Sequence, residues 1–140
     1  MPVNTEKLQK KLAQLEIFTQ DVRSMRDSAK TDYTIKSMTE AAAERRLEKA
    51  IQCAIDIASY IVAQEAMGTP TQYKDVFFFL ERVGVLPPDL TDRLESMVGF
   101  RNKLIHQYET IDPIRIYELV QSDIDDLVAF AQAISAKYLI

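Results

Sequence analysis

Apolar residues recur every three or four positions along most of the chain, the spacing that places them on one face of an α-helix. In the N-terminal part they predict a helix that is capped by Asn4 or Thr5 and runs to about Ser28. A second, longer helix is expected to begin behind a cap at Asp32 and to reach Met67, because neither Gly nor Pro interrupts that stretch. Its broad apolar face can contact several other helices.

The middle of the chain holds one segment of ambiguous pattern. The residues at 68–71, Gly-Thr-Pro-Thr, break the long helix. The run at 76–80, Val-Phe-Phe-Phe-Leu, has the aromatic content of a strand, but no second segment offers it a partner. We therefore predict a short helix that stops at Gly84.

Prolines mark the starts of the last two predicted helices. Pro87 and Pro88 start a helix that should end near Tyr108, and Asp112 followed by Pro113 combines an N-cap with a proline in the first turn. The last helix carries a near-heptad apolar seam: Tyr117, Val120, Ile124, Leu127, Ala131, Ile134 and Tyr138. Such a seam suits nearly antiparallel packing. The chain is thus predicted to be all-α, a single domain over residues 1–140 that forms an antiparallel bundle of four long helices and one short helix.

An arginine interrupts the apolar stripe of the penultimate long helix. The stripe comprises Leu90, Leu94, Met97, position 101, Leu104 and position 108. Arg101 fills an apolar slot and shares its face with Tyr108, while Asn102 and His106 lie four residues apart on the neighbouring face. A permanent cation beside a group that titrates near neutrality can act on a phosphoryl group. The last turn of a helix also favours the charged imidazolium. Two structural alternatives remain: Arg101 could pair with an acid of the long helix, and a lone histidine could be an ordinary surface residue.

Composition removes most other kinds of site. One His, one Cys and three Gly leave no glycine-rich phosphate loop, no His or Cys metal cluster and no Ser-His-Asp triad, so neither a metal nor a cofactor is expected. Four acids lie on the long helix, but no Glu-x-x-His pair accompanies them: Glu44, Glu48, Asp56 and Glu65. The phenylalanines at 77–79 are expected to pack in the core, with a base-stacking platform as the alternative.

Charge and hydropathy indicate a cytoplasmic protein with a confined binding site. The net charge of −4 and the pI near 5.0 argue against broad binding to nucleic acid, which would have to occur in a local basic cleft. Cys53 lies among apolar residues and is expected to be a buried small hydrophobe in a reducing compartment. No apolar run is long enough for a membrane span, and no leader is recognisable behind the N-terminus.

The stretch Arg101-Asn102-Lys103-Leu104-Ile105-His106 resembles the Arg-polar-x-x-x-His motif of the HEPN superfamily of helical ribonucleases and nucleotide-binding domains. Extended to Tyr108, it is similar to the signature of the HepT-like branch, the toxins of toxin–antitoxin pairs. The resemblance implies a metal-independent endoribonuclease in which the 2′-hydroxyl attacks the adjacent phosphate.

The same resemblance assigns roles to the residues of the motif. It implies that His106 is the acid/base residue, that Arg101 holds the scissile phosphate and that Asn102 orients one of these or the substrate. Lys103, beside them, is a candidate substrate-binding residue. The resemblance also implies that a partner nucleotidyltransferase antitoxin attaches AMP to Tyr108, which would place bulk and negative charge where RNA must bind.

A homodimer is expected on two grounds. Transesterification is best served by one group that takes a proton and another that gives one, and each chain has a single histidine. The family resemblance implies dimers whose motifs face each other. Two alternative functions stay open: a non-catalytic helical module that binds a nucleotide or a nucleotidyltransferase partner, and a plain helical adaptor.

Overall fold

The computed structural model of the protein describes residues 2–106 and 111–139, and no strand occurs within those ranges. Its elements are α1 (Thr5–Arg23), α2 (Met38–Gln64), α3 (Asp75–Arg82), α4 (Pro88–His106), α5 (Pro113–Glu118) and α6 (Asp125–Tyr138), with a 3-10 turn at Lys30–Asp32 and a π-helical turn at Leu119–Asp123. The predicted all-α bundle of four long helices and one short helix is confirmed, with the last long helix interrupted.

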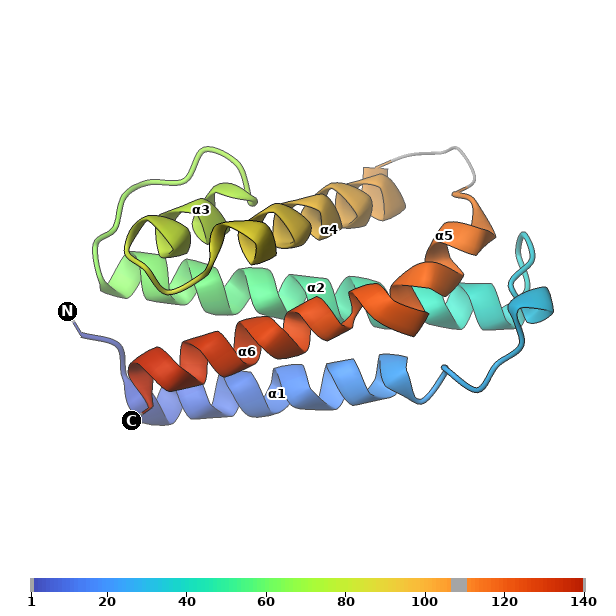
Figure 1. The fold of residues 1–140 in the computed structure, drawn as a ribbon, viewed down its shortest axis with the longest axis horizontal. Coiled ribbons are helices and arrows are strands. Elements are labelled where there is room, and N and C mark those ends of the chain that lie inside the picture. Colours follow the sequence, from blue (N-terminus) through green and yellow to red (C-terminus); the bar gives the residue numbers. More distant parts are fainter. Residues whose placement is uncertain (1, 107–110, 140) are drawn as a thin grey trace.

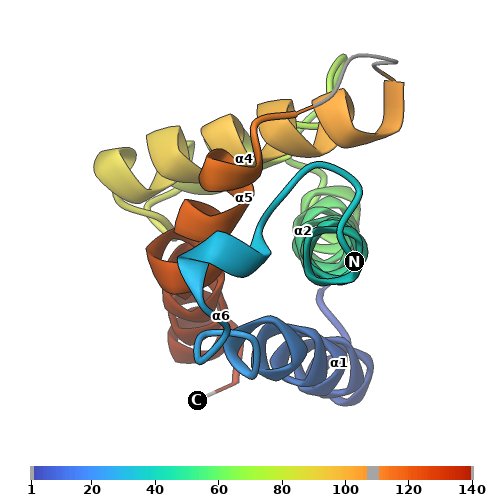
Figure 2. The same ribbon diagram turned by 90° about the vertical axis from the view of Figure 1, so that its right-hand side faces the viewer.

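Helices α1, α2 and α6 run side by side, with α2 and α6 antiparallel to α1, and α4 lies obliquely across α2 and α6 (Figures 1 and 2). Helix α2 contacts α1, α3, α4, α5 and α6 and is therefore the centre of the bundle. The broad apolar face predicted for it is buried, from Leu47 through Val62. Short α3 packs beside α4, with Phe77 buried edge-on against Phe130 at 5.6 Å between ring centroids. The core role expected for the phenylalanine cluster thus holds for Phe77, whereas Phe78 is exposed.

Local capping explains where three of the helices begin. Asn4 caps α1 by accepting a hydrogen bond from the backbone N–H of Lys7, and Asp112 caps α5 by accepting one from Ile114, with Pro113 in the first turn as predicted. The cap predicted at Asp32 is wrong. Ser37 caps α2 instead, because its hydroxyl accepts from the N–H of Glu40 at 3.0 Å.

The reason for the later start of α2 is a variant of the capping box, in which the glutamate binds the N–H one residue before the N-cap Ser37. The carboxylate of Glu40 reaches back to accept the N–H of Lys36 at 2.8 Å, and Lys36 takes a left-handed φ of 62° that a helix cannot contain. Asp32 ends up in the short 3-10 turn. Helix α1 also ends earlier than predicted, at Arg23 rather than Ser28, and a series of tight turns follows it.

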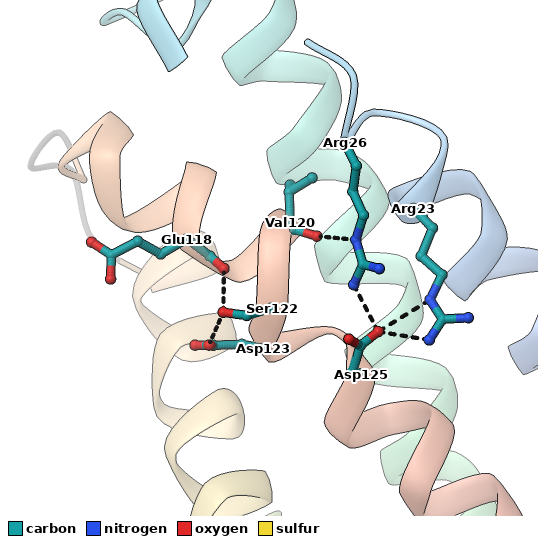
Figure 3. A network of polar contacts seen from close by, with 7 residues as sticks. All are labelled: Arg23, Arg26, Glu118, Val120, Ser122, Asp123 and Asp125. Carbon is teal, nitrogen blue, oxygen red and sulfur yellow. Dashed lines mark hydrogen bonds and ion pairs between the residues drawn. The ribbon is translucent and has the colours of Figure 1, made fainter. Parts of the chain in front are cut away.

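The interruption between α5 and α6 is tied to the end of α1. In the π-helical turn the N–H of Ile124 reaches back to the carbonyl of Leu119, and the side chain of Arg26 donates from Nε to the carbonyl of Val120 at 3.0 Å. Arg23 and Arg26 both donate to one carboxylate oxygen of Asp125, at 2.6 and 2.7 Å (Figure 3). The bend in the last helix is thus held by two cations from a segment about a hundred residues away.

Candidate active site on α4

The apolar stripe of α4 is buried until it reaches the arginine. Leu90, Leu94 and Met97 are buried against the bundle, whereas Arg101 and Leu104 are half-buried. Arg101 lies where α4 crosses α2 and projects toward it. The arginine therefore occupies the edge of the core rather than the open surface.

Three side chains surround the guanidinium group of Arg101. Nη2 donates to Oε1 of Gln52 on α2, and Nη1 donates to Oδ1 of Asn102 at 3.1 Å. The ring of Tyr73, from the segment between α2 and α3, lies over the group with its centroid 5.3 Å from Cζ. We call Arg101, Asn102, Gln52 and Tyr73 the Arg101 cluster. It joins three elements at the crossing of α4 and α2.

The alternative that Arg101 pairs with an acid of the long helix is wrong within the described residues. Its partner on that helix is the amide of Gln52, and the acid comes one step later: Nε2 of Gln52 donates to Oδ1 of Asp56 at 2.8 Å. Asp56 lies one turn further along α2 and is exposed. A neutral amide fixes the guanidinium without cancelling its charge.

The hydrogen-bond inventory of Arg101 leaves room for an anion. Of the five N–H donors of a guanidinium group, one goes to Gln52 and one to Asn102. The Nε donor is enclosed and has no hydrogen-bond partner among the described residues. One hydrogen on each terminal nitrogen also has no acceptor within residues 2–106 and 111–139. Two donors on a planar cation are what a phosphate or carboxylate accepts as a bidentate ligand.

The other residues of the predicted site lie at different places around α4. Asn102 is half-buried and hydrogen-bonded to Arg101, and His106 is exposed at the last described residue of the helix. Lys103 is exposed on another side of α4, where it lines an open pocket of about 550 Å³ together with Gly99 and Arg115. The structure thus brings Arg101 and Asn102 together and places Lys103 apart from them. Tyr108 lies outside the described residues.

Two members of the Arg101 cluster were not identified from the sequence. Gln52 had a usable signal, because Gln52 and Asp56 are polar residues one helical turn apart within the otherwise apolar run 50–58. Tyr73 had none, since it belongs to an irregular segment whose position depends on the tertiary structure.

Two other residues of α2, Glu44 and Cys53, have shifted pKa values but do not form a second candidate active site. Burial, followed by the hydrogen bond and charge of Glu40, raises the pKa of Glu44 to about 7. Burial, followed by the charge of Asp56, raises the pKa of the Cys53 thiol to about 11, and this cysteine is part of the core as expected. Within the described ranges, no three His, Cys, Asp or Glu side chains are grouped to hold a metal ion. No described helix is both long enough and apolar enough to cross a bilayer.

Comparisons with known proteins agree with the all-α fold and identify the family. The chain is similar to an mRNA nuclease HepT of Shewanella oneidensis, with 31% identity over 91 residues that cover 65% of this chain and 68% of that protein. It is also similar to a tRNA nuclease HepT of Aphanizomenon flos-aquae, with 28% identity over 109 residues that cover 78% and 74% of the two chains.

A solved structure shares the fold. The tri-AMPylated HEPN toxin of Shewanella oneidensis, in complex with an MNT antitoxin, superposes with a TM-score of 0.83 over 92% of this chain and 96% of that chain, at 23% identity. The model of one family, ribonuclease HepT-like, matches residues 8–134. The chain belongs to the HepT-like ribonuclease family.

Proposed function

We propose that the protein is a toxin endoribonuclease that cleaves RNA without a metal ion and that a nucleotidyltransferase antitoxin neutralises. The observation that carries the proposal is the state of Arg101, which lies on the same helix as the only histidine. Among the described residues it is fixed by two neutral side chains, has no acidic partner and keeps two donors without an acceptor. The two relatives named above are nucleases that act on RNA. Their substrate class supports RNA phosphate as the anion that Arg101 binds.

The reaction assigned to this site is an internal transesterification. The 2′-oxygen loses its proton, attacks the adjacent phosphorus and forms a cyclic phosphate, while the bond to the 5′-oxygen breaks and that oxygen takes up a proton. His106 moves these protons as acid or base. Arg101 binds the non-bridging oxygens as their charge grows, and Asn102 orients the guanidinium through the Nη1 hydrogen bond. Lys103 contacts the RNA chain beyond the scissile phosphate.

The reaction needs a proton acceptor and a proton donor, and one chain has one histidine. A homodimer that brings two copies of the motif together supplies both, as well as two arginines. Its test is the concentration dependence of cleavage. Specific activity should fall on dilution in step with the dimer fraction measured by light scattering. Constant activity in a fully monomeric sample would contradict a composite site.

Neutralisation is assigned to AMP attached to Tyr108 by an MNT-type antitoxin. The structurally similar toxin is AMPylated and bound to such an antitoxin, and an adenylyl phosphate two residues from His106 would compete with RNA for the positive charge of Arg101. The intact mass of the protein, co-expressed with its cognate antitoxin, should increase by whole AMP units. The Tyr108→Phe variant should not gain the first of them.

The ribonuclease itself is tested with the purified chain, free of antitoxin, on total RNA and on tRNA. Wild type should produce fragments with a cyclic phosphate and a 5′-hydroxyl, undiminished by EDTA, and His106→Ala should produce none. A matched pair of variants on one helix isolates the role of Arg101: Arg101→Lys should lose most activity, whereas Arg93→Lys, two turns upstream and paired with Asp89 and Asp126, should keep it.

Equal cleavage by wild type and His106→Ala would refute the assignment. Micromolar binding of AMP or ATP that depends on Arg101, without cleavage, would identify the chain as a nucleotide-binding module of the same fold.

A further inference from the structure

A second recognition element adjoins the Arg101 cluster. The segment between α2 and α3 covers an open pocket of about 470 Å³. Its lining comes from Ser59 of α2, from the segment at 70–73 and from Val76 of α3. The volume falls in the range of about 300–1,000 Å³ that small-molecule sites occupy. Both apolar and polar residues line the pocket. A flat heteroaromatic group, which has apolar faces and polar edges, therefore suits it.

The wall of this pocket is held in place by one carboxylate. Oδ2 of Asp75 accepts hydrogen bonds from the backbone N–H of Thr71 at 3.1 Å, from the hydroxyl of Thr71 at 2.8 Å and from the N–H of Gln72 at 3.0 Å. The Thr71 hydroxyl is the main reason why the pKa of Asp75 is lowered, so the carboxylate is charged at neutral pH. Nearer to α2, Arg82 donates to the carbonyl of Met67 at 3.0 Å. The pocket is therefore preformed.

Tyr73 connects the pocket to the arginine. The residue is one of those that line the pocket, its ring lies over the guanidinium of Arg101, and it is 57% exposed. An exposed aromatic ring beside a cation is the combination by which proteins bind single-stranded nucleic acid, since the ring stacks on a base and the cation binds the backbone. Phe78 on α3 is a comparable exposed aromatic, 46% exposed, whose described ring contact is Phe79.

We infer that this pocket binds one unpaired base of the RNA strand, stacked on Tyr73, while Arg101 holds a phosphate next to that base. The inference rests on the proposed function and adds to it a determinant of cleavage position. Ser59 and Gln72 are among the residues that line the pocket, and their side chains carry a hydroxyl and an amide, groups that can hydrogen-bond to a base edge. The base that fits those donors and acceptors sets the preferred sequence at the cut.

A binding experiment separates this inference from catalysis. The probe is a fully 2′-O-methylated oligonucleotide that contains 2-aminopurine, which has no 2′-hydroxyl to react and whose fluorescence falls when its base stacks. Wild type should quench it, and so should His106→Ala. Tyr73→Phe keeps the ring and should quench as wild type does. Tyr73→Leu should abolish the quenching and weaken binding, measured by anisotropy, by about tenfold, which corresponds to about 1.4 kcal/mol for one lost stacking contact.

The matched control is Phe78→Leu, which removes an exposed ring that neither lines the pocket nor has a described contact with Arg101 and should change neither quenching nor affinity. A second readout is the cleavage profile on a mixed-sequence RNA. Tyr73→Leu should flatten the base preference next to the cut, whereas Tyr73→Phe should preserve it.

Two results would overturn the inference: quenching and affinity within twofold of wild type in Tyr73→Leu, or a uniform loss of cleavage rate with an unchanged base preference. The second result would mean that Tyr73 only positions Arg101. Failure of the proposed function is a different outcome, because wild type would then leave RNA intact whatever the probe shows.

Discussion

Replacing Gln52 by Glu would change one group beside Arg101 and neutralise the positive charge of the site. The side chain of Gln52 presents its carbonyl oxygen to Nη2 of Arg101 and its amide nitrogen to Asp56. In Gln52→Glu the contact to the guanidinium becomes an ion pair, the donor to Asp56 is lost and two carboxylates face each other one helical turn apart. Arg101 would keep its position and lose its excess positive charge.

The expected effect on binding follows from Coulomb's law. A carboxylate on one side of the guanidinium and an RNA phosphate on the other are about 6 Å apart, which at an effective dielectric constant between about 20 and about 80 gives a repulsion of about 1–3 kcal/mol. A value of about 2 kcal/mol corresponds to a decrease of roughly 30-fold in kcat/KM. The stability should change by less than about 1 kcal/mol, because the half-exposed ion pair gained and the repulsion from Asp56 are both small and opposite in sign.

The assay compares kcat/KM on a defined RNA with the free energy of unfolding from urea titration. The double variant Gln52→Glu/Asp56→Asn is the matched control. Its new amide at position 56 would donate to the new carboxylate at position 52 and remove the repulsion, while the lost charge at Arg101 persists. Both variants should fold and cleave poorly. If Gln52→Glu cleaves within threefold of wild type while remaining folded, the argument that a neutral partner preserves the charge of Arg101 is refuted.

Three further predictions concern stability. Because the pKa of Glu44 is raised to about 7 in the folded chain, the stability linked to it is full below pH 4.5 and is lost as the pH rises to 7. Glu44→Gln, which keeps the hydrogen bond to Glu40, should therefore be more stable than wild type at pH 8 by about 1 kcal/mol but not at pH 4.5, as measured by urea unfolding. Asp125→Ala removes the acceptor shared by two arginines at the end of α1 and should lower the stability by about 1 kcal/mol, a loss that 1 M salt reduces. Phe77→Ala deletes a fully buried ring packed edge-on against Phe130 and should lower the unfolding free energy by about 3–5 kcal/mol; a loss below 1 kcal/mol would contradict the packing.

The parts of the fold that the sequence predicts are those whose signals are local. The cap formed by Asp112 and Pro113 and the stripe Leu90, Leu94 and Met97 are each contained in a few consecutive turns, and each appears where expected. The start of α2 was mispredicted although its signal is also local. Asp32 and Ser37 are both of residue types that cap helices, but only Ser37 is followed three residues later by a glutamate, Glu40, whose carboxylate accepts the N–H of Lys36 just before the cap.

The interruption of the last helix could not be predicted from a local sequence signal. Its apolar seam continues with regular spacing across the π-helical turn, so the pattern predicts one uninterrupted helix. What favours the turn is tertiary: Arg26, from the end of α1, donates to the carbonyl of Val120, and Gln121 donates to the carbonyl of Arg26 at 2.9 Å. Contacts across about 95 positions of sequence leave no trace in the spacing of one helix.

The partner of Arg101 is also set by a tertiary contact, the packing of α4 on α2, and this contact determines whether the charge of the arginine is available for function. Most arginines with described partners are matched by acids, such as Arg93 by Asp89 and Asp126, and Arg115 by Asp123. In a chain with a net charge of −4, an arginine held by an acid would present little positive potential to RNA. Within the part of the chain that the structure describes, Arg101 is held by amides instead, so its charge remains available at the edge of the core. A stripe pattern can locate this arginine, but only the packing of α4 on α2 distinguishes a structural ion pair from a cation left to bind an external anion.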